Sequence, residues 1–230
     1  MKRPLHPPGN ALQAILLDID GTLIDSNDAH ARAWAGALAA HGYVVPFEQL
    51  RPLIGKGGDK ILPELVGLDP ESGEAERVSE ARSALFLDEL PRLQPTRGAR
   101  ALLELFRDEG WQLLVATSAK KDEVTLILQQ AGVADLIEAA TSSDDAEHSK
   151  PDPDIVQAAL RNAHLHASNG VMLGDTPYDI EAAGRARVPA IALRCGGWWA
   201  DDAFREALAI FDDPEDLRAN FATSPLRGRA

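Results

Sequence analysis

The sequence predicts an α/β fold in which helices cover both faces of a parallel β-sheet, with a smaller helical domain inserted into it. Three observations lead to this prediction. Short apolar runs recur along the chain, segments with helical spacing separate them, and one long stretch contains helical patterns alone. Strands that alternate with helices build doubly wound sheets, because each parallel connection needs a crossover. With 230 residues, 45% of them hydrophobic, the chain is long enough to bury such a core.

Four apolar runs are predicted to be the strands of the sheet. Each run is nearly continuous, which is typical of strands that are buried on both faces. The predicted strands are residues 14–17, 113–116, 171–173 and 190–193.

Helices are predicted between and after these strands. Residues 98–109 and 121–131 have apolar side chains at helical spacing, and a glycine follows each segment, which favours a helix C-terminus there. Residues 153–164 and 177–186 have a proline in the first turn, where its missing N–H group is not needed. The acidic run at residues 212–215 predicts one more helix start.

Residues 23–92 interrupt the alternation and are predicted to form the inserted helical domain. The expected helices are residues 27–41, 46–52, 57–66 and 73–90. Asn27 and Asp59 are the expected capping residues. Residues 1–22 and 93–230 then form one α/β core domain. Inserted helical bundles of this size act as lids or as structural appendages.

The charge balance excludes several classes of function. Lys and Arg number 23 against 36 Asp and Glu, and the net charge of −13 repels nucleic-acid phosphates and anionic membranes. We therefore expect neither a nucleic acid nor a membrane as partner. The apolar stretch at residues 11–17 is stopped by Asp18, so no targeting segment is predicted. The single cysteine, Cys195, fits a reducing compartment, and we expect a cytoplasmic protein.

Two acids lie at the carboxyl end of the first predicted strand. Asp18 and Asp20 are two residues apart, so their side chains converge at the edge where open α/β sheets bind ligands. Two carboxylates this close need a cation or a raised pKa, which predicts a hard metal ion or a protonated acid. The alternative is that both are turn or capping acids.

Hydroxyl groups and a lysine are expected at the same edge. Thr117 and Ser118 follow the second predicted strand and precede a helix, which makes either an anion site or a simple helix cap. Lys150 lies directly before Pro151 and a predicted helix. Its ammonium group is expected over a phosphate or a carboxylate, or alternatively in solvent.

Two further acids follow the third predicted strand. Asp175 can complete a metal site with Asp18. Asp179 lies one helical turn later, where it can bind a metal ion or orient Lys150.

In order and spacing these residues resemble the haloacid dehalogenase superfamily. The motifs that support the resemblance are Asp18-Ile19-Asp20-Gly21-Thr22, Thr117-Ser118, Lys150-Pro151 and Gly174-Asp175 with Asp179. They cover nearly the whole chain. The inserted domain is similar to the superfamily's first type of cap, as in phosphoglycolate phosphatase and β-phosphoglucomutase relatives. The resemblance implies a Rossmann-like core.

The resemblance also implies a chemistry, namely hydrolysis of a small phosphorylated metabolite through an aspartyl-phosphate. Asp18 would be the nucleophile, and Asp20 would be the general acid and then the base. Mg²⁺ would be the cofactor, and the implied metal-binding residues are Asp18, Asp20 through its backbone carbonyl, Asp175 and Asp179. The residues implied to bind the transferring oxygens are Thr117, Ser118 and Lys150.

Two residues of the inserted domain are candidates for substrate binding. His30 is similar to a histidine that couples cap closure to the acid/base aspartate in β-phosphoglucomutases, although His30 and Trp34 could simply pack on one helix face. Lys56 lies on a glycine-rich turn, where it contacts a substrate anion or is solvated.

Three functions remain open at this point. A phosphatase is the first, because by this resemblance Asp20 would donate a proton to a leaving alcohol. A leaving halide needs no proton, so dehalogenation is not expected. A sugar phosphomutase is the second, although no arginine lies where the mutases bind the distal phosphate. A catalytically silent protein that only binds a phosphorylated ligand is the third. A monomer or a small homo-oligomer is expected.

Overall fold

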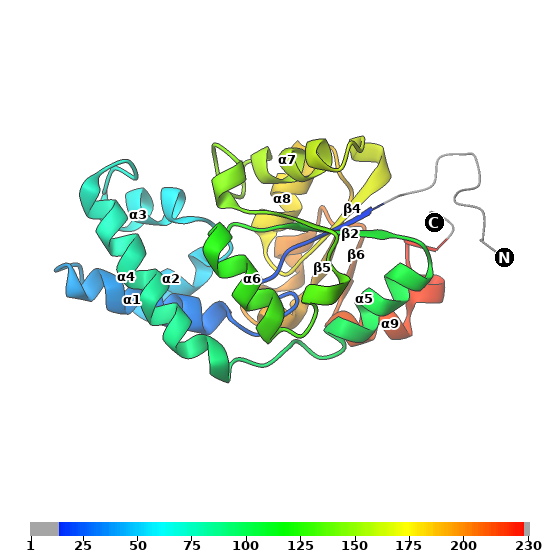
Figure 1. Ribbon diagram of the computed structural model, residues 1–230, viewed down its shortest axis with the longest axis horizontal. Helices are drawn as coiled ribbons and strands as arrows, with labels where there is room; N and C mark the ends of the chain where they lie inside the picture. Colours follow the sequence, from blue (N-terminus) through cyan, green and yellow to red (C-terminus); the bar gives the residue numbers. More distant parts are fainter. Residues whose placement is uncertain (1–13, 228–230) are drawn as a thin grey trace.

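The computed structural model describes residues 14–227, so residues 1–13 of the predicted core domain and residues 228–230 lie outside the described part. Six strands form one parallel sheet in the order β3-β2-β1-β4-β5-β6 (Figure 1). The strands are β1 (Ala14–Leu17), β2 (Gln112–Ala116), β3 (Ala139–Thr141), β4 (Gly170–Gly174), β5 (Ala190–Leu193) and β6 (Ala209–Phe211). This order confirms the predicted doubly wound α/β sheet, and the strand order reverses at β1 and β4.

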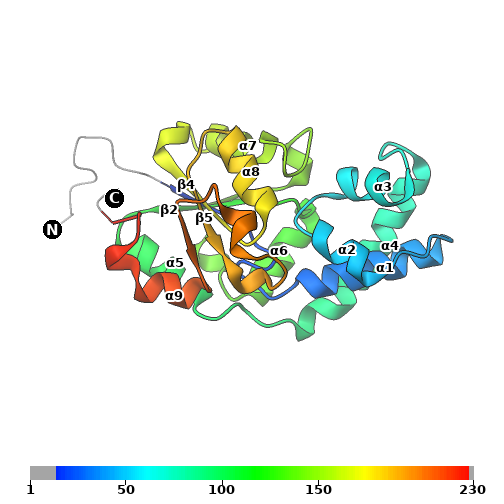
Figure 2. The ribbon, with the colours of Figure 1, turned by 180° about the vertical axis from the view of Figure 1, so that it is seen from behind.

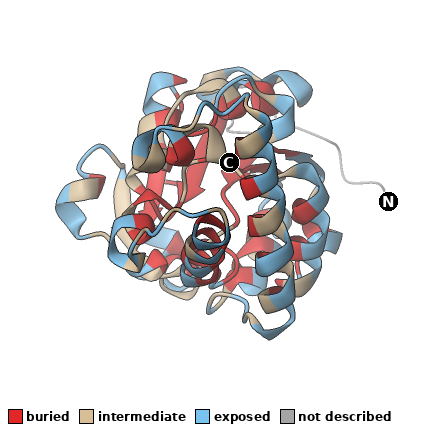
Figure 3. Ribbon diagram, turned by 90° about the vertical axis from the view of Figure 1, so that its left-hand side faces the viewer, coloured by how far each residue is buried: buried red, intermediate tan, exposed pale blue. Residues whose placement is uncertain are grey.

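Helices cover both faces of the sheet, because successive side chains of a buried strand point to opposite sides. Ile15 and Leu17 of β1 pack against one group of helices, and Leu16 packs against the other. The first group is α5 (Ala99–Asp108), α6 (Lys121–Gln130) and α9 (Pro214–Ala219), and the second is α7 (Asp154–Asn162) and α8 (Pro177–Arg185). Figure 3 shows buried residues gathered in the strands, with exposed residues on the outside of the surrounding helices.

Four helices between β1 and α5 lie on the side of the molecule away from the chain termini (Figures 1 and 2). They are α1 (Asn27–Ala40), α2 (Phe47–Leu50), α3 (Gly58–Val66) and α4 (Gly73–Glu89). These four helices, called the helical unit below, share a hydrophobic cluster of their own around Trp34, Leu38 and Ile61.

The two predicted caps in the helical unit are wrong. Ser26 precedes α1 and Gly57 precedes α3 as the capping residues. Asn27 and Asp59 instead lie inside the first turns, and their side chains bond to the core, Asn27 to Asp175 and Asp59 to Ser149.

The chain leaves the core and returns to it at one place. Ile24 forms an antiparallel bridge with Pro95. The Asp25 N–H donates to the carbonyl of Gln94 at 3.0 Å, and the Thr96 N–H donates to that of Leu23 at 3.0 Å. The two crossings therefore lie side by side and bind each other.

Among the helices of residues 14–227, none combines the length and the apolar character that crossing a membrane requires.

Candidate active site

The carboxyl edge of the sheet holds the predicted polar residues. Asp18 and Asp20 follow β1, Thr117 and Ser118 follow β2, Asp175 follows β4, Asp179 lies in the first turn of α8, and Lys150 lies on the loop before α7. Open α/β sheets bind ligands at the carboxyl ends of their strands, at the point where the strand order reverses, which here lies between β1 and β4.

Lys150 is the charged centre of this group. Its side chain is fully buried, and Nζ lies 2.6 Å from Oδ1 of Asp18 and 2.6 Å from Oδ1 of Asp179. Burial by itself would lower the pKa of Lys150, but the charges of Asp179 and Asp18 outweigh it and hold the pKa above the ordinary value. Lys150 is therefore a paired ammonium and not a solvated loop residue.

Three buried acids form a compact cluster beside this lysine. Asp18, Asp175 and Asp179 each offer a carboxylate oxygen, and these oxygens all lie within 4.8 Å of one another. Burial raises the pKa of Asp18 well above its ordinary value, with Lys150 opposing. Burial, and next the charge of Asp179, raise the pKa of Asp175 to about 7. The acids therefore repel one another unless a cation or protons neutralise them.

The donor set of this cluster fits a hard divalent cation. Carboxylate oxygens are the ligands that Mg²⁺ prefers, and a cation would remove the cost of keeping three buried acids ionised. Asp175 is already oriented, because Thr22 Oγ1 donates to its Oδ1 at 3.0 Å and Asn27 Nδ2 donates to its Oδ2 at 2.7 Å.

Gly21 allows these groups to come together. Its φ is +79°, in the left-handed region that favours glycine. A Cβ at this position would lie 2.1 Å from Asn27 Nδ2 and 2.2 Å from Asp175 Oδ2. No larger residue fits between the first motif and Asp175.

The Asp20 carboxylate points away from the acid cluster and towards the helical unit. It accepts a hydrogen bond from Ser26 Oγ at 2.6 Å and lies 2.9 Å from His30 Nε2. Burial would raise its pKa, but the charge and hydrogen bond of His30 and the hydroxyl of Ser26 lower it. The structure therefore does not bring the Asp20 side chain among the other acids.

His30 does more than pack on a helix face. Its ring stacks on Phe86 of α4, with centroids 3.8 Å apart and an interplanar angle of 13°. The same ring contacts Asp20, so α1 and α4 of the helical unit fix a group beside the acid.

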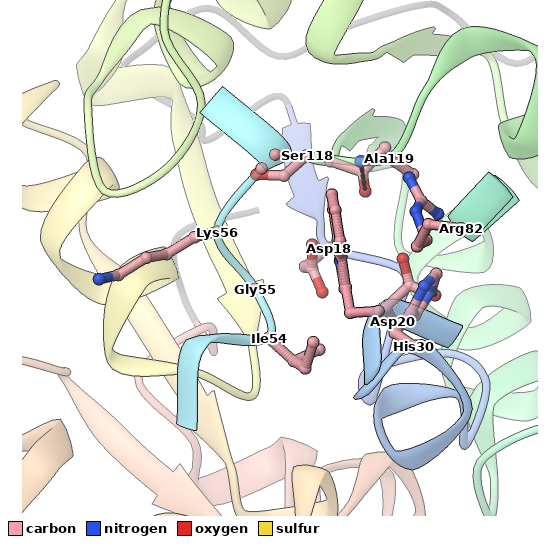
Figure 4. A pocket seen from close by; sticks show the side chains of 13 residues that line it. Asp18, Asp20, His30, Ile54, Gly55, Lys56, Arg82, Ser118 and Ala119 are labelled. Carbon is pink, nitrogen blue, oxygen red and sulfur yellow. Dashed lines mark hydrogen bonds and ion pairs between the residues drawn. The ribbon is translucent and has the colours of Figure 1, made fainter. Parts of the chain in front are cut away.

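Thr117 and Ser118 differ in what they bind. Thr117 Oγ1 accepts a hydrogen bond from the Ala119 N–H at 3.1 Å, which is a turn-capping bond. Ser118 Oγ is buried and has no partner among the described residues, and Ser118 lines one pocket with Asp18 and Asp20. Ser118 therefore forms part of the pocket wall (Figure 4), and its hydroxyl is a buried atom with no hydrogen bond among the described residues.

The Lys56 ammonium is not brought to the acids. It lies 2.6 Å from Glu64 Oε2 and 4.9 Å from the centroid of the Tyr178 ring. Figure 4 shows this side chain pointing away from Asp18. The turn that includes Gly55 and Gly57 still lines the pocket.

Sequence reasoning missed Arg82 of α4, which also lines the pocket (Figure 4). Its side chain is 8% exposed, Nη1 donates to Glu123 Oε2 at 2.9 Å, and its guanidinium carbon lies 5.3 Å from the Trp34 ring centroid. Nε has no partner among the described residues. The sequence gives no signal for this position, because α4 is rich in arginine and glutamate that are typical of a solvated helix.

Comparisons with known proteins agree with this geometry. Residues 15–193 match the family of haloacid dehalogenase-like hydrolases. Phosphoglycolate phosphatase from Rhodospirillum rubrum is 29% identical over 211 residues, which are 87% of each chain. A hydrolase from Pseudomonas syringae, of known crystal structure, superposes with a TM-score of 0.84 at 28% identity, covering 92% of this chain and 98% of that one. β-Phosphoglucomutase from Clostridium difficile shares the fold, with a TM-score of 0.81 at 15% identity, covering 92% and 96%.

Proposed function

Because the chain belongs to the haloacid dehalogenase-like hydrolases, we propose that it is a Mg²⁺-dependent phosphatase that hydrolyses a small phosphorylated metabolite. The observation that supports this most is Lys150 Nζ, which bridges Asp18 and Asp179 within the cluster of buried acids. A buried ammonium beside a buried carboxylate suits attack by that carboxylate on an anionic phosphorus centre.

Two displacements divide the reaction. In the first, an oxygen of Asp18 forms a bond to phosphorus, the bond to the substrate oxygen breaks, and Asp20 gives its proton to that oxygen. In the second, water attacks the aspartyl-phosphate, Asp20 takes the proton of the water, and the Asp18 carboxylate is released with inorganic phosphate. In this proposal Lys150, Thr117 and the backbone N–H of Ser118 bind the transferring oxygens.

Asp18, Asp175 and Asp179, with the backbone carbonyl of Asp20, would hold Mg²⁺. When bound, the ion supplies positive charge that lets an anionic nucleophile approach a phosphate anion. Asp20 is ionised at rest, since its pKa lies below the ordinary value. An incoming phosphate anion near Asp20 raises that pKa, which favours proton uptake before the first displacement.

Residues 23–92 act as a cap over this chemistry in our proposal. The helical unit supplies His30 to Asp20 and Arg82 to the wall of the pocket, so it completes the site from outside the core. Exclusion of water by such a unit strengthens the electrostatic interactions beneath it.

A sugar phosphomutase is the enzyme alternative, and it would need a second site for a distal phosphate. The Lys56 ammonium is bound to Glu64, which gives this alternative no support. We further propose that the protein works in the cytoplasm as a monomer or small homo-oligomer.

Phosphate release tests the proposal. Sugar phosphates, phosphoglycolate and nucleotides are incubated with the protein in Mg²⁺ or in chelator, and Asp18→Asn is compared with Asp108→Asn, an exposed acid at the end of α5. Release that needs metal, is lost in Asp18→Asn and is kept in Asp108→Asn is the expected result. An isomeric phosphate in place of free phosphate would identify a mutase. Release that survives in Asp18→Asn would contradict the mechanism, and phosphate binding without turnover would indicate a binding protein.

A further inference from the structure

Ser149, the residue directly before Lys150, is bound by the helical unit. Its side chain is buried, and its Oγ donates to Asp59 Oδ1 at 2.5 Å. The same Oγ accepts a hydrogen bond from the Gly57 N–H at 2.9 Å, and the Ser149 N–H donates to Asp59 Oδ2 at 3.2 Å. Three hydrogen bonds therefore join the start of α3 to a single core residue.

The start of α3 lies so close to Ser149 that the contact requires a glycine at position 57 and an acid at position 59. A Cβ on Gly57 would lie 2.6 Å from Ser149 Cβ and 2.7 Å from its Oγ, so any other residue would push the two backbones apart. Asp59, in the first turn of α3, spans the hydroxyl and the amide of Ser149 with its two oxygens. Together Gly57 and Asp59 fix both the backbone and the side chain of Ser149.

The backbone of Lys150 follows Ser149 directly, and its ammonium group contacts Asp18 and Asp179. Its ammonium bonds with Asp18 and Asp179 place the far end of a side chain that has four rotatable bonds. The near end is set by the backbone next to Ser149, where the Asp152 N–H closes a turn on the Ser149 carbonyl at 3.1 Å. A change in the backbone position of Ser149 would therefore shift the Cα atom of Lys150.

We propose that Asp59 and Ser149 are positioning residues, which set Lys150 over Asp18 when the helical unit is docked. The proposal rests on the proposed phosphatase function. Rotation or retreat of α3 would release Ser149 and with it the geometry of the buried lysine. Docking of the helical unit then controls the rate of phosphoryl transfer as well as access of water.

A neighbouring ion pair offers a matched control. Lys60 Nζ lies 2.6 Å from Asp152 Oδ2, so this pair joins the same helix to the same loop. The Asp152 carboxylate does not contact Ser149, although it also pairs with Arg185 Nη1 at 2.9 Å. Lys60 Nζ lies 3.7 Å from Asp59 Oδ2, which is longer than its contact with Asp152. Asp152→Asn weakens the docking of α3 without removing any of the three bonds to Ser149.

The test measures kcat and KM for p-nitrophenyl phosphate, with thermal unfolding of each variant. Ser149→Ala and Asp59→Asn are expected to lower kcat by about tenfold or more while KM changes by less than about twofold, because small displacements of reacting groups slow the chemical step. The double variant should be no slower than the slower single variant, since both changes remove the same contact. Asp152→Asn should keep kcat within about twofold of the unchanged protein.

Two results would overturn the proposal. One is an unchanged kcat in Ser149→Ala, and the other is an equal loss of kcat in Asp152→Asn, which would mean that docking strength alone matters.

Hydrogen–deuterium exchange of the segment 147–152 distinguishes failure of this proposal from failure of the proposed phosphatase function. If the unchanged protein hydrolyses no phosphate ester, faster exchange there in Asp59→Asn, but not in Asp152→Asn, still supports control of the lysine loop by Asp59, and unchanged exchange contradicts it.

Discussion

The site buries more carboxylates than positively charged groups. Lys150 faces Asp18 and Asp179 directly, and Asp175 lies in the same cluster with only neutral donors, Thr22 and Asn27, on its oxygens. One ammonium cannot neutralise three carboxylates. The response of the protein to pH and to metal ions should therefore originate here.

Metal binding should stabilise the protein more at high pH than at low pH. The folded-state pKa of Asp175, about 7, lies above the unfolded value. Its contribution to stability is therefore fully present below the unfolded pKa and is lost as the pH rises through about 7. Because Mg²⁺ binds the ionised acid, we expect it to raise Tm more at about pH 8 than at about pH 5.

Differential scanning fluorimetry at the two pH values measures this effect. Asp175→Asn should abolish the gain, and Asp201→Asn, a change at an exposed acid paired with Arg194, should keep it. Equal gains in Tm at both pH values would show that Asp175 does not govern the binding.

The pKa of Asp20 should depend on His30. His30→Gln removes the charge and the ring hydrogen bond that lower the pKa of Asp20, so that pKa is expected to rise. An NMR titration of the aspartate carboxyl carbons measures the shift. His148→Gln is the control, because His148 is half exposed and pairs with Asp154. A pKa of Asp20 that stays or falls in His30→Gln would contradict this account.

The sequence predicted the acids better than their partners. Asp18 and Asp175 follow continuous apolar strands, and parallel strands must bring such residues to one edge. The resemblance implied that His30 lies beside Asp20, and the structure places it there. The stacking of His30 on Phe86 and the position of Arg82 depend on how α1 and α4 meet the core. That docking is a tertiary contact, and spacing along the chain does not encode it.

Among the elements, predicted strands succeeded where the apolar run was continuous. β3 was missed because it has three residues, Ala139–Thr141, and no long apolar run marks it. β6 lies in an apolar run, residues 207–211, that was not predicted to be a strand, and none of its three residues is fully buried. The helices of the core were predicted within two residues at each end, since proline or glycine marks one boundary of each of α5 to α8. The pair β3 and β6 forms the two edges of the sheet, where burial is least.

The ion pair between α4 and α6 should be costly to break from one side. Arg82 and Glu123 are 8% and 2% exposed, so removal of one partner leaves a buried charge unpaired. We expect Glu123→Gln to lower the free energy of unfolding by about 3 kcal/mol. The double change Arg82→Met with Glu123→Leu should cost less than Glu123→Gln, because no buried charge remains.

Urea unfolding measures both variants. The exposed pair of Arg32 and Glu89, which joins α1 to α4, is the matched control. Glu89→Gln should change the free energy of unfolding by less than about 1 kcal/mol. A similar cost for Glu89→Gln and Glu123→Gln would mean that burial does not decide the strength of these pairs.

The net charge of the whole molecule opposes the approach of a phosphate ester, the proposed substrate. A net charge of −13 repels phosphate esters at long range, while the site attracts them only at close range. Salt screens the long-range part first, since the Debye length is about 10 Å at 0.1 M. With Mg²⁺ held constant, kcat/KM for p-nitrophenyl phosphate should rise between about 10 and about 150 mM KCl. A fall in kcat/KM over this range would show that local attraction governs the encounter.

The paired crossings near Ile24 and Pro95 bear on how such a protein diversifies. The outgoing and returning segments are joined directly by backbone hydrogen bonds. The insert is therefore attached to the core in the same way as a loop is attached to the two strands of a hairpin. The free energy of closing a loop grows only with the logarithm of its length. Evolution can therefore lengthen, shorten or exchange the insert at this junction while the strand ends that hold the acids stay unchanged. One hydrolytic core can in this way acquire new leaving-group preferences from a single module.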